Sequence, residues 1–409
     1  MTAKSHAIAG LSSQVWRVIW CVAALITITM GLRAGFGLFL SPISIDLQMG
    51  REVFGLAVAV QNLVWGAASP VFGGLADKYG VARVTLLGTL LYVLGLLLMA
   101  ATSGPFEIIA GNLFIGLALG AAGLSTVLGA VGRIVAPERR SLALGLVTAG
   151  GSFGQFAVVP FTQVLIDGFG WSGAFVGLAA GAVLMLPLIW GVRDTPPAAA
   201  SSGGQTLRQA LAEALRHRGF WLLTIGFFVC GFQLVFVSTH LPAYLTDQGL
   251  PGWLGAWTLA LVGLFNILGS YAAGILGGRH LKKNVLAMIY LARAAVFLLF
   301  MLLPLSPASV LLFGVALGLL WLSTVPLTSG LIATVFGPAY MSMLFGVVFF
   351  SHQVGSFFGA WMGGKLFDMF GSYDAMWWIS VALGLAAAAL HWPIVERPVM
   401  RLATAAAAK

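Results

Sequence analysis

The feature that most constrains this chain is a series of apolar stretches, each about as long as a helix that crosses a bilayer. Crossing the hydrocarbon core takes roughly 20 apolar residues. Only 8% of the 409 residues are charged, against about 25% in soluble globular domains. The sequence therefore predicts an all-α integral membrane protein whose surface faces lipid. The predicted spans are 17–40, 53–75, 83–101, 107–130, 141–166, 171–192, 219–245, 254–277, 284–303, 308–334, 341–366 and 373–395.

A polar segment divides these twelve spans six and six. It begins "RDTPPAAASSGG" and continues as a polar helical pattern, as a linker would. We therefore expect one six-helix bundle over 1–192, a linker over 193–218, and a second bundle with a short tail over 219–409. Each second span of a half ends in glycines and a basic turn, "GGLADKYGVAR" and "GILGGRHLKK". Such repeated halves are typical of secondary transporters.

Lysine and arginine predict the orientation. With the N-terminus inside, 17 of the 21 basic residues lie on the inner side. The exceptions are Arg51 and Lys365 near outer helix ends, and Arg33 and Arg293 within spans. Both termini and the linker are expected to be cytoplasmic, in a bacterial inner membrane. This bias accounts for the net charge of +9, and no nucleic-acid partner is expected.

The loop after the second span carries a recognisable motif. It resembles the Gly-x-Leu-Ala-Asp-x-x-Gly-x-x-basic loop of the major facilitator superfamily. The resemblance implies two six-helix bundles with pseudo-two-fold symmetry around a cavity that opens alternately to each side. It also implies that the first, fourth, seventh and tenth helices line that cavity, and that this loop is a conformational latch. The latch residues would be Gly73, Asp77, Gly80 and Arg83.

A second motif points to a branch of that superfamily. "ERRSLALGLVTAGGSFGQF", residues 138–156, resembles the fifth-helix signature of monocarboxylate transporters and of the bacterial oxalate–formate branch. The resemblance implies a carboxylate substrate and proton symport. Two features of the pattern are absent: the acidic-Gly-Gly-Trp-Gly-Trp entry to the first helix, and the eighth-helix arginine that would hold the carboxylate. Asn266 is the polar residue of that region.

Arg33 is the strongest candidate substrate ligand. An arginine at mid-membrane costs about 2.5–3.5 kcal/mol, and no Asp or Glu shares its depth in the sequence. Its guanidinium fork matches a carboxylate bidentately. We expect it to bind an organic anion. The alternative is that Arg33 binds backbone carbonyls or reaches the outer headgroups. For Arg293, on a peripheral helix, we expect a structural bond to a neighbouring helix.

Two histidines within spans are candidate proton carriers and substrate ligands, His240 and His352. Histidine titrates near physiological pH; the alternative is a neutral ring bonded between helices. Neither has a second ligand at metal-binding spacing, so no metal or other cofactor is expected. Five neutral residues complete the predicted site, each with helix packing as the competing interpretation: Asn112, Tyr244, Asn266, Trp321 and Ser323. Pro326 breaks a backbone bond in the tenth span and predicts a hinge or exposed carbonyls there.

Enzyme motifs are absent from the sequence, because no glycine-rich turn has the strand or the lysine that a nucleotide site requires. We expect a monomeric secondary transporter of a small organic anion, most simply a monocarboxylate, working by alternating access. Proton symport, anion exchange and uniport remain open. The alternative is an efflux carrier for hydrophobic or drug-like compounds, which favours a buried acid that the spans lack.

Overall fold

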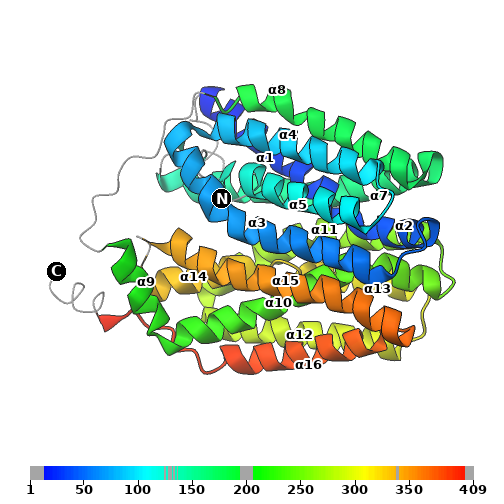
Figure 1. Cartoon of the computed structure of the whole chain (residues 1–409). Coiled ribbons are helices and arrows are strands. Elements are labelled where there is room, and N and C mark those ends of the chain that lie inside the picture. The colour runs from blue at the N-terminus through cyan, green and yellow to red at the C-terminus, as the bar shows by residue number, and fades with distance from the viewer. Residues whose placement is uncertain are drawn as a thin grey trace, which may run out of the picture. The chain divides into compact units, whose positions relative to one another are not determined.

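The computed structural model describes residues 13–123, 126–127, 131, 134–135, 137–193, 206–337 and 340–400. Every regular element within these residues is a helix (Figure 1). Eleven helical stretches of the described chain are long and apolar enough to cross a membrane. One of them, Ala143–Trp190, contains two predicted spans that meet at Gly170, where φ is +69°. The predicted all-α membrane fold is confirmed.

The chain forms two compact units. The first comprises Met1–Met49 and Val64–Ala199. Its first span is interrupted in its last third, because α1 gives way to a short 3-10 helix, η1. In this unit α1 packs along α7, and α4 packs along α5. Its elements are α1 (Ser13–Ala34), η1 (Phe36–Phe39), α2 (Leu40–Asp46), the second part of α3 (Arg51–Tyr79), α4 (Val81–Ala100), α5 (Pro105–Ala122), α7 (Pro137–Val183) and α8 (Met185–Trp190).

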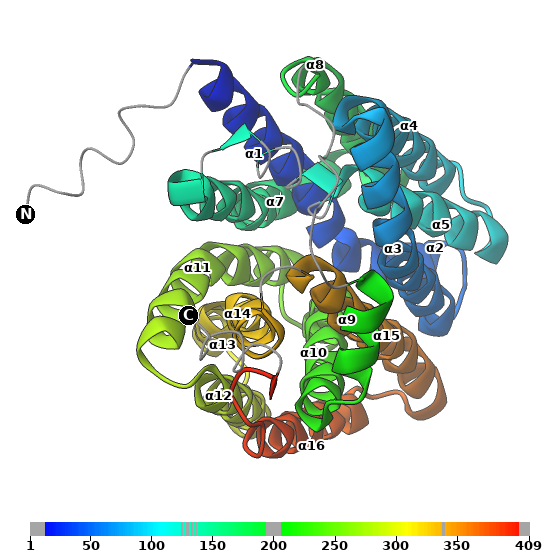
Figure 2. The same ribbon diagram turned by 90° about the vertical axis from the view of Figure 1, so that its left-hand side faces the viewer.

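The second unit comprises Gly50–Leu63 and Ala200–Lys409, so it includes the beginning of α3. Its helices are seen nearly end-on in Figure 2, where α10 lies beside α15 and α12 beside α16. Their bounds are α9 (Leu207–Leu215), α10 (Arg218–Asp247), α11 (Gly252–Arg279), α12 (Lys282–Leu302), α13 (Pro307–Leu320), α14 (Thr324–Phe336), α15 (Met341–Phe370) and α16 (Asp374–His391).

Local sequence sets where several of these helices begin. Ser306 caps α13: its hydroxyl accepts the Ser309 N–H at 3.2 Å, and Pro307 occupies the first turn, where proline's missing N–H has no cost. Thr206 forms a capping box with Gln209 at the start of α9. The polar helical pattern predicted at the end of the linker is therefore a helix.

The core of the second unit is aromatic. Trp377 is 1% exposed. Its ring packs edge-on against Phe236 at 4.9 Å between centroids, and lies 5.1 Å from Phe300. Large rings bury much apolar area with few rotatable bonds, so they fix α10, α12 and α16 against one another.

Candidate functional site

Arg33 lies where the first span breaks. It occupies the last turn of α1, where the negative end of the helix dipole favours a cation. The residue is partly exposed, and its guanidinium carbon lies 5.0 Å from the centre of the Trp65 ring on α3. That distance is within the range of a cation–π contact. The first unit thus holds a permanent cation beside an aromatic face, at a helix break inside a membrane span.

Close helix packing supports this arrangement. A Cβ on Gly31 would lie 2.7 Å from the Gly154 carbonyl oxygen of α7, and one on Gly150 would lie 2.8 Å from the Ala23 carbonyl oxygen of α1. The Thr27 hydroxyl donates to the Gly150 carbonyl at 2.9 Å. The glycines of the fifth-span signature therefore let α7 approach the helix that carries Arg33, which is the packing role expected for them.

The tenth span is also broken, between α13 and α14. A helix end leaves its last carbonyls without intrahelical donors. Arg293 of α12, which is 0% exposed, supplies donors: its Nη2 donates to the Leu320 carbonyl at 2.6 Å and to the Trp321 carbonyl. On the opposite side the Leu322 N–H donates to Asn266 Oδ1 at 2.9 Å. The structural role predicted for Arg293 is confirmed.

Three predicted substrate ligands lie around this break. The oxygen of Asn266 accepts from the Leu322 backbone and from Ser270 Oγ at 3.2 Å. The Ser323 hydroxyl donates to the Leu319 carbonyl at 2.7 Å, and Trp321 is 6% exposed. The structure brings these residues together. In it, the polar atoms of Asn266 and Ser323 bond to the protein itself.

The beginning of α3 is anchored to α10 and α15. Both oxygens of Asp368 accept backbone N–H groups of α3, from Arg51 at 2.9 Å and from Glu52 at 2.7 Å. A carboxylate is favourable at this positive end of a helix. The Arg51 guanidinium donates to both oxygens of Asp247, at 2.6 and 2.7 Å, and to the Tyr373 hydroxyl at 3.0 Å. We call Arg51, Asp247, Asp368 and Tyr373 the α3 anchor.

His240 lies behind the α3 anchor and is fully buried. Its Nε2 is 2.7 Å from the Ala360 carbonyl oxygen, and its Nδ1 is 3.3 Å from the Tyr373 hydroxyl. Tyr373 lies between the spans formed by α15 and α16, and burial raises the pKa of its phenol even though the Arg51 charge acts in the opposite direction. The phenol is therefore neutral and can donate to His240.

Each of the remaining predicted ligands has contacts within its own unit. Tyr244 is partly buried, with its ring edge-on to Trp377 at 5.5 Å. The Asn112 amide donates to the Ile108 carbonyl at 3.0 Å in its own helix, and the residue is fully buried. His352 stacks on Phe349, with 5.6 Å between ring centres, and its Nδ1 lies 3.0 Å from Gln353 Oε1.

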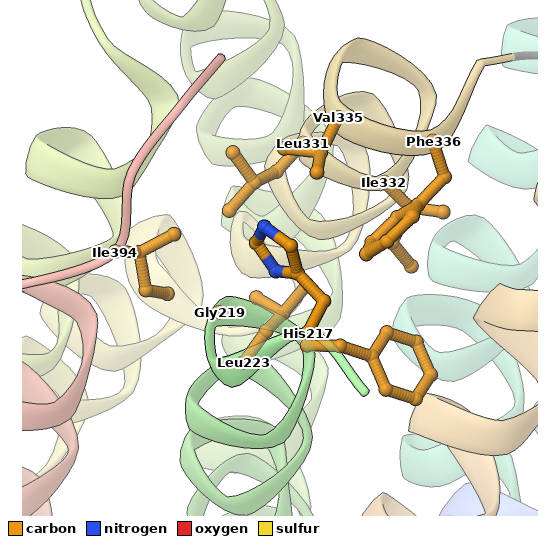
Figure 3. A pocket seen from close by; sticks show the side chains of 9 residues that line it. His217, Gly219, Leu223, Leu331, Ile332, Val335, Phe336 and Ile394 are labelled. Carbon is orange, nitrogen blue, oxygen red and sulfur yellow. The ribbon is translucent and has the colours of Figure 1, made fainter. Parts of the chain in front are cut away.

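A small apolar pocket opens at the start of α10 (Figure 3). The space between its lining residues, counted together with the adjoining solvent, is about 210 Å³. His217 is its one polar side chain, and the ring packs edge-on to Phe336 at 5.3 Å. The pocket offers a substrate little room and no permanent charge. Its lining is His217, Gly219, Phe220, Leu223, Leu331, Ile332, Val335, Phe336 and Ile394.

Comparison with known proteins identifies the family. The family model described as the Major Facilitator Superfamily matches residues 19–360. The chain belongs to the major facilitator superfamily. It is thus an integral, multi-pass membrane transporter, as its spans and loop motif predicted.

Individual relatives agree with this assignment. The chain is 25% identical over 365 residues to the uncharacterised MFS-type transporter YcxA of Bacillus subtilis, covering 83% of this chain and 85% of that protein. It is 26% identical over 387 residues to monocarboxylate transporter 13 of Rattus norvegicus, covering 91% and 86%. The crystal structure of a D-xylose–proton symporter superposes with a TM-score of 0.72 at 16% identity, covering 94% of this chain and 98% of that one.

The superfamily loop motif falls at the joint between α3 and α4. Gly80 lies between the two helices with φ +93°, a conformation that L side chains rarely adopt. Gly73 lies on α3 with open space around its Cα, and Arg83 is exposed. Asp77 is in the last turns of α3; its side chain lies outside the described residues.

Sequence reasoning did not identify the α3 anchor. Its members are far apart in the chain: Asp247 comes 196 positions after Arg51, and Tyr373 comes 322 positions after it. A signal was present: Arg51 and Lys365 were the basic residues at outer helix ends. In the structure Arg51 pairs with Asp247, and Lys365 Nζ lies 3.4 Å from Glu52 Oε1. Two of the four exceptions to the charge bias therefore have acidic partners.

Proposed function

We propose that this transporter carries a small organic anion, a monocarboxylate, by alternating access, with Arg33 binding the carboxylate. In this proposal the six-helix halves 1–192 and 219–409, joined by the linker 193–218, move relative to each other in an inner membrane with both termini cytoplasmic. The loop residues Gly73, Asp77, Gly80 and Arg83 serve as the latch of that movement.

The observation that carries the proposal is the setting of Arg33. A charged residue inside a span is a functional-site candidate by default, and this one lies partly exposed at a helix break over Trp65. A guanidinium can bind a carboxylate with two parallel hydrogen bonds. An aromatic wall beside it suits the short apolar body of a monocarboxylate. Relatives named as monocarboxylate transporters support the same substrate class.

Proton symport is the coupling we propose. The acids of the described spans lie near helix ends, as Asp46, Glu107 and Asp247 do. An intramembrane carboxylate relay is therefore not the simplest route for a proton. A histidine is the alternative carrier, and His240 is the better placed of the two candidates because its ring contacts the α3 anchor.

Uptake into proteoliposomes tests the substrate class. Purified protein is reconstituted and offered a panel of labelled organic acids, with and without an inward proton gradient. We expect saturable uptake of a monocarboxylate, accelerated by the gradient, and loss of uptake in Arg33→Ala. Arg33→Lys keeps the charge but not the fork, so it should raise KM more than it lowers kcat.

The matched control is Arg208→Ala, which removes an exposed arginine from α9 and should leave uptake unchanged. Counterflow without any response to the proton gradient would indicate exchange. Uptake of hydrophobic cations in place of acids would contradict the proposal and favour the efflux alternative.

A further inference from the structure

A chain of hydrogen bonds joins His240 to the α3 anchor, and its donors can be assigned. A carbonyl oxygen only accepts, so the Nε2 of His240, which faces the Ala360 carbonyl at 2.7 Å, carries a hydrogen. In the neutral ring Nδ1 is then an acceptor. It faces the Tyr373 hydroxyl at 3.3 Å, so the phenol is the donor of that bond.

The same phenol oxygen is an acceptor on its other side. Arg51 Nη1 donates to it at 3.0 Å, and the guanidinium also holds Asp247. The chain of hydrogen bonds therefore runs from Asp247 through Arg51, Tyr373 and His240 to the Ala360 carbonyl. Each donor hydrogen in it takes part in one bond. This arrangement is complete only while His240 is neutral.

We propose that His240 is a proton-binding site, and that a proton on its Nδ1 and the Arg51–Tyr373 contact exclude each other. A protonated Nδ1 is a donor and needs an acceptor. The phenol could accept only by turning its own hydrogen away from His240, toward the side occupied by the Arg51 donor. The protonated ring would also place a second buried cation behind the guanidinium, where repulsion is weakly screened.

The consequence is a link between proton occupancy and the position of α3. The first part of α3 belongs to the second unit, and the same helix continues into the first unit from Val64. Losing the Arg51–Tyr373 bond weakens the hold of the second unit on the beginning of this helix, while the bonds to Asp247 and Asp368 remain. By linkage, any state in which α3 has left them binds the His240 proton more tightly. The inference rests on the proposed transport by alternating access and names the groups that couple a proton to it.

Other ionisable groups lie on the elements packed around His240. The facing turn of α11 contributes Gly255, packed against Pro242, and no ionisable side chain. The groups facing this region are Arg51 and Glu52 from α3, Tyr244 and Asp247 from α10, Lys365 and Asp368 from α15, and Tyr373 and Asp374 before and at the start of α16.

Hydrogen–deuterium exchange of the purified full-length protein in lipid nanodiscs tests the proposal without measuring transport. The readout is the protection of backbone amides in residues 51–63, after the intrinsic pH dependence of exchange is divided out. An imidazole freed into water titrates near pH 6.5, so lowering the pH from 8 to 5.5 should increase opening of this segment about 10-fold.

Two variants and a control separate the explanations. His240→Gln can donate to Ala360 and accept from Tyr373 but cannot be protonated, so the pH response should disappear. Tyr373→Phe removes the shared hydroxyl, so protection at pH 8 should fall and the pH response should shrink; this variant also serves if His240→Gln does not fold. His391→Gln alters a buried histidine of α16, bonded to the Ala387 carbonyl, and should respond as wild type does.

A wild-type protein with no pH response, or a His240→Gln variant that responds like wild type, would overturn the inference. Loss of the pH response together with intact uptake of labelled acid would refute only the proton site. An intact pH response in a protein that takes up no acid would refute only the proposed function.

Discussion

Arg293 should be essential to the stability of the broken tenth span. Its guanidinium donates to the carbonyls of Leu320 and Trp321, and Arg293→Leu would leave both acceptors buried. Each such loss costs roughly 1–3 kcal/mol, and removing the desolvated charge returns part of that sum. We expect a net destabilisation of about 2–5 kcal/mol, which for a chain of 409 residues lowers the Tm by roughly 2–6 °C.

Thermal unfolding of the purified protein, followed by intrinsic fluorescence, measures this effect. Arg293→Lys keeps the charge but cannot span two carbonyls as the guanidinium does, so it should fall between leucine and wild type. Arg216→Leu, an exposed position after α9, should change stability by no more than about 0.5 kcal/mol. If Arg293→Leu unfolded at the wild-type temperature, the carbonyls at the break would be satisfied without Arg293 and this reasoning would be wrong.

Three further predictions concern single residues. Gly80→Ala should lose about 1–3 kcal/mol of stability because the φ of +93° at this position strains any side chain. Gly73→Ala, with open space around it, should be neutral or slightly stabilising. Unfolding curves of the two variants measure the difference, and equal stabilities would contradict the prediction. Gly150→Val should lower the stability of the protein by about 1–3 kcal/mol through overpacking against α1. Gly145→Ala, whose new Cβ meets nothing within 4 Å, should leave the stability unchanged. Equal Tm values for the two variants would contradict this prediction. Asn266→Leu should lower the stability by about 1–3 kcal/mol because it leaves the Leu322 N–H without its acceptor. A double-mutant cycle with Arg293→Leu should show a coupling energy, since both residues bond to the backbone at the same helix break.

The sequence was sufficient for the fold because span length and apolarity follow from the solvent. Any segment that crosses hydrocarbon must satisfy its own backbone, so each apolar stretch predicted a helix and the polar linker predicted the division between them. Pro326 predicted a break in the tenth span. The structure places it at residues 321–323, which include Leu322, the residue whose carbonyl the missing proline N–H would have bonded.

The side-chain partners could be predicted only in part. Arg293 was correctly expected to be structural, because a cation on a peripheral helix without an acid must find neutral oxygens. The sequence could not show which oxygens, since the carbonyls of Leu320 and Trp321 become acceptors only once the helix breaks. Asn266 was a candidate ligand because it is the polar residue in the region where the monocarboxylate pattern has its arginine, and a backbone N–H proved to be one of its partners. The α3 anchor depends on tertiary packing across more than 190 positions of sequence, which no local pattern encodes.

The central claim is that Arg33 binds the carboxylate of the substrate, and equilibrium binding measures it most directly. A labelled monocarboxylate identified by uptake is titrated into purified wild type, Arg33→Ala and Arg208→Ala. A charged hydrogen-bonded contact is worth about 1.5–3 kcal/mol, so Arg33→Ala should raise the Kd by roughly 10- to 150-fold, while Arg208→Ala binds as wild type does. An Arg33→Ala protein that remains folded and binds the acid with the wild-type Kd would contradict the account.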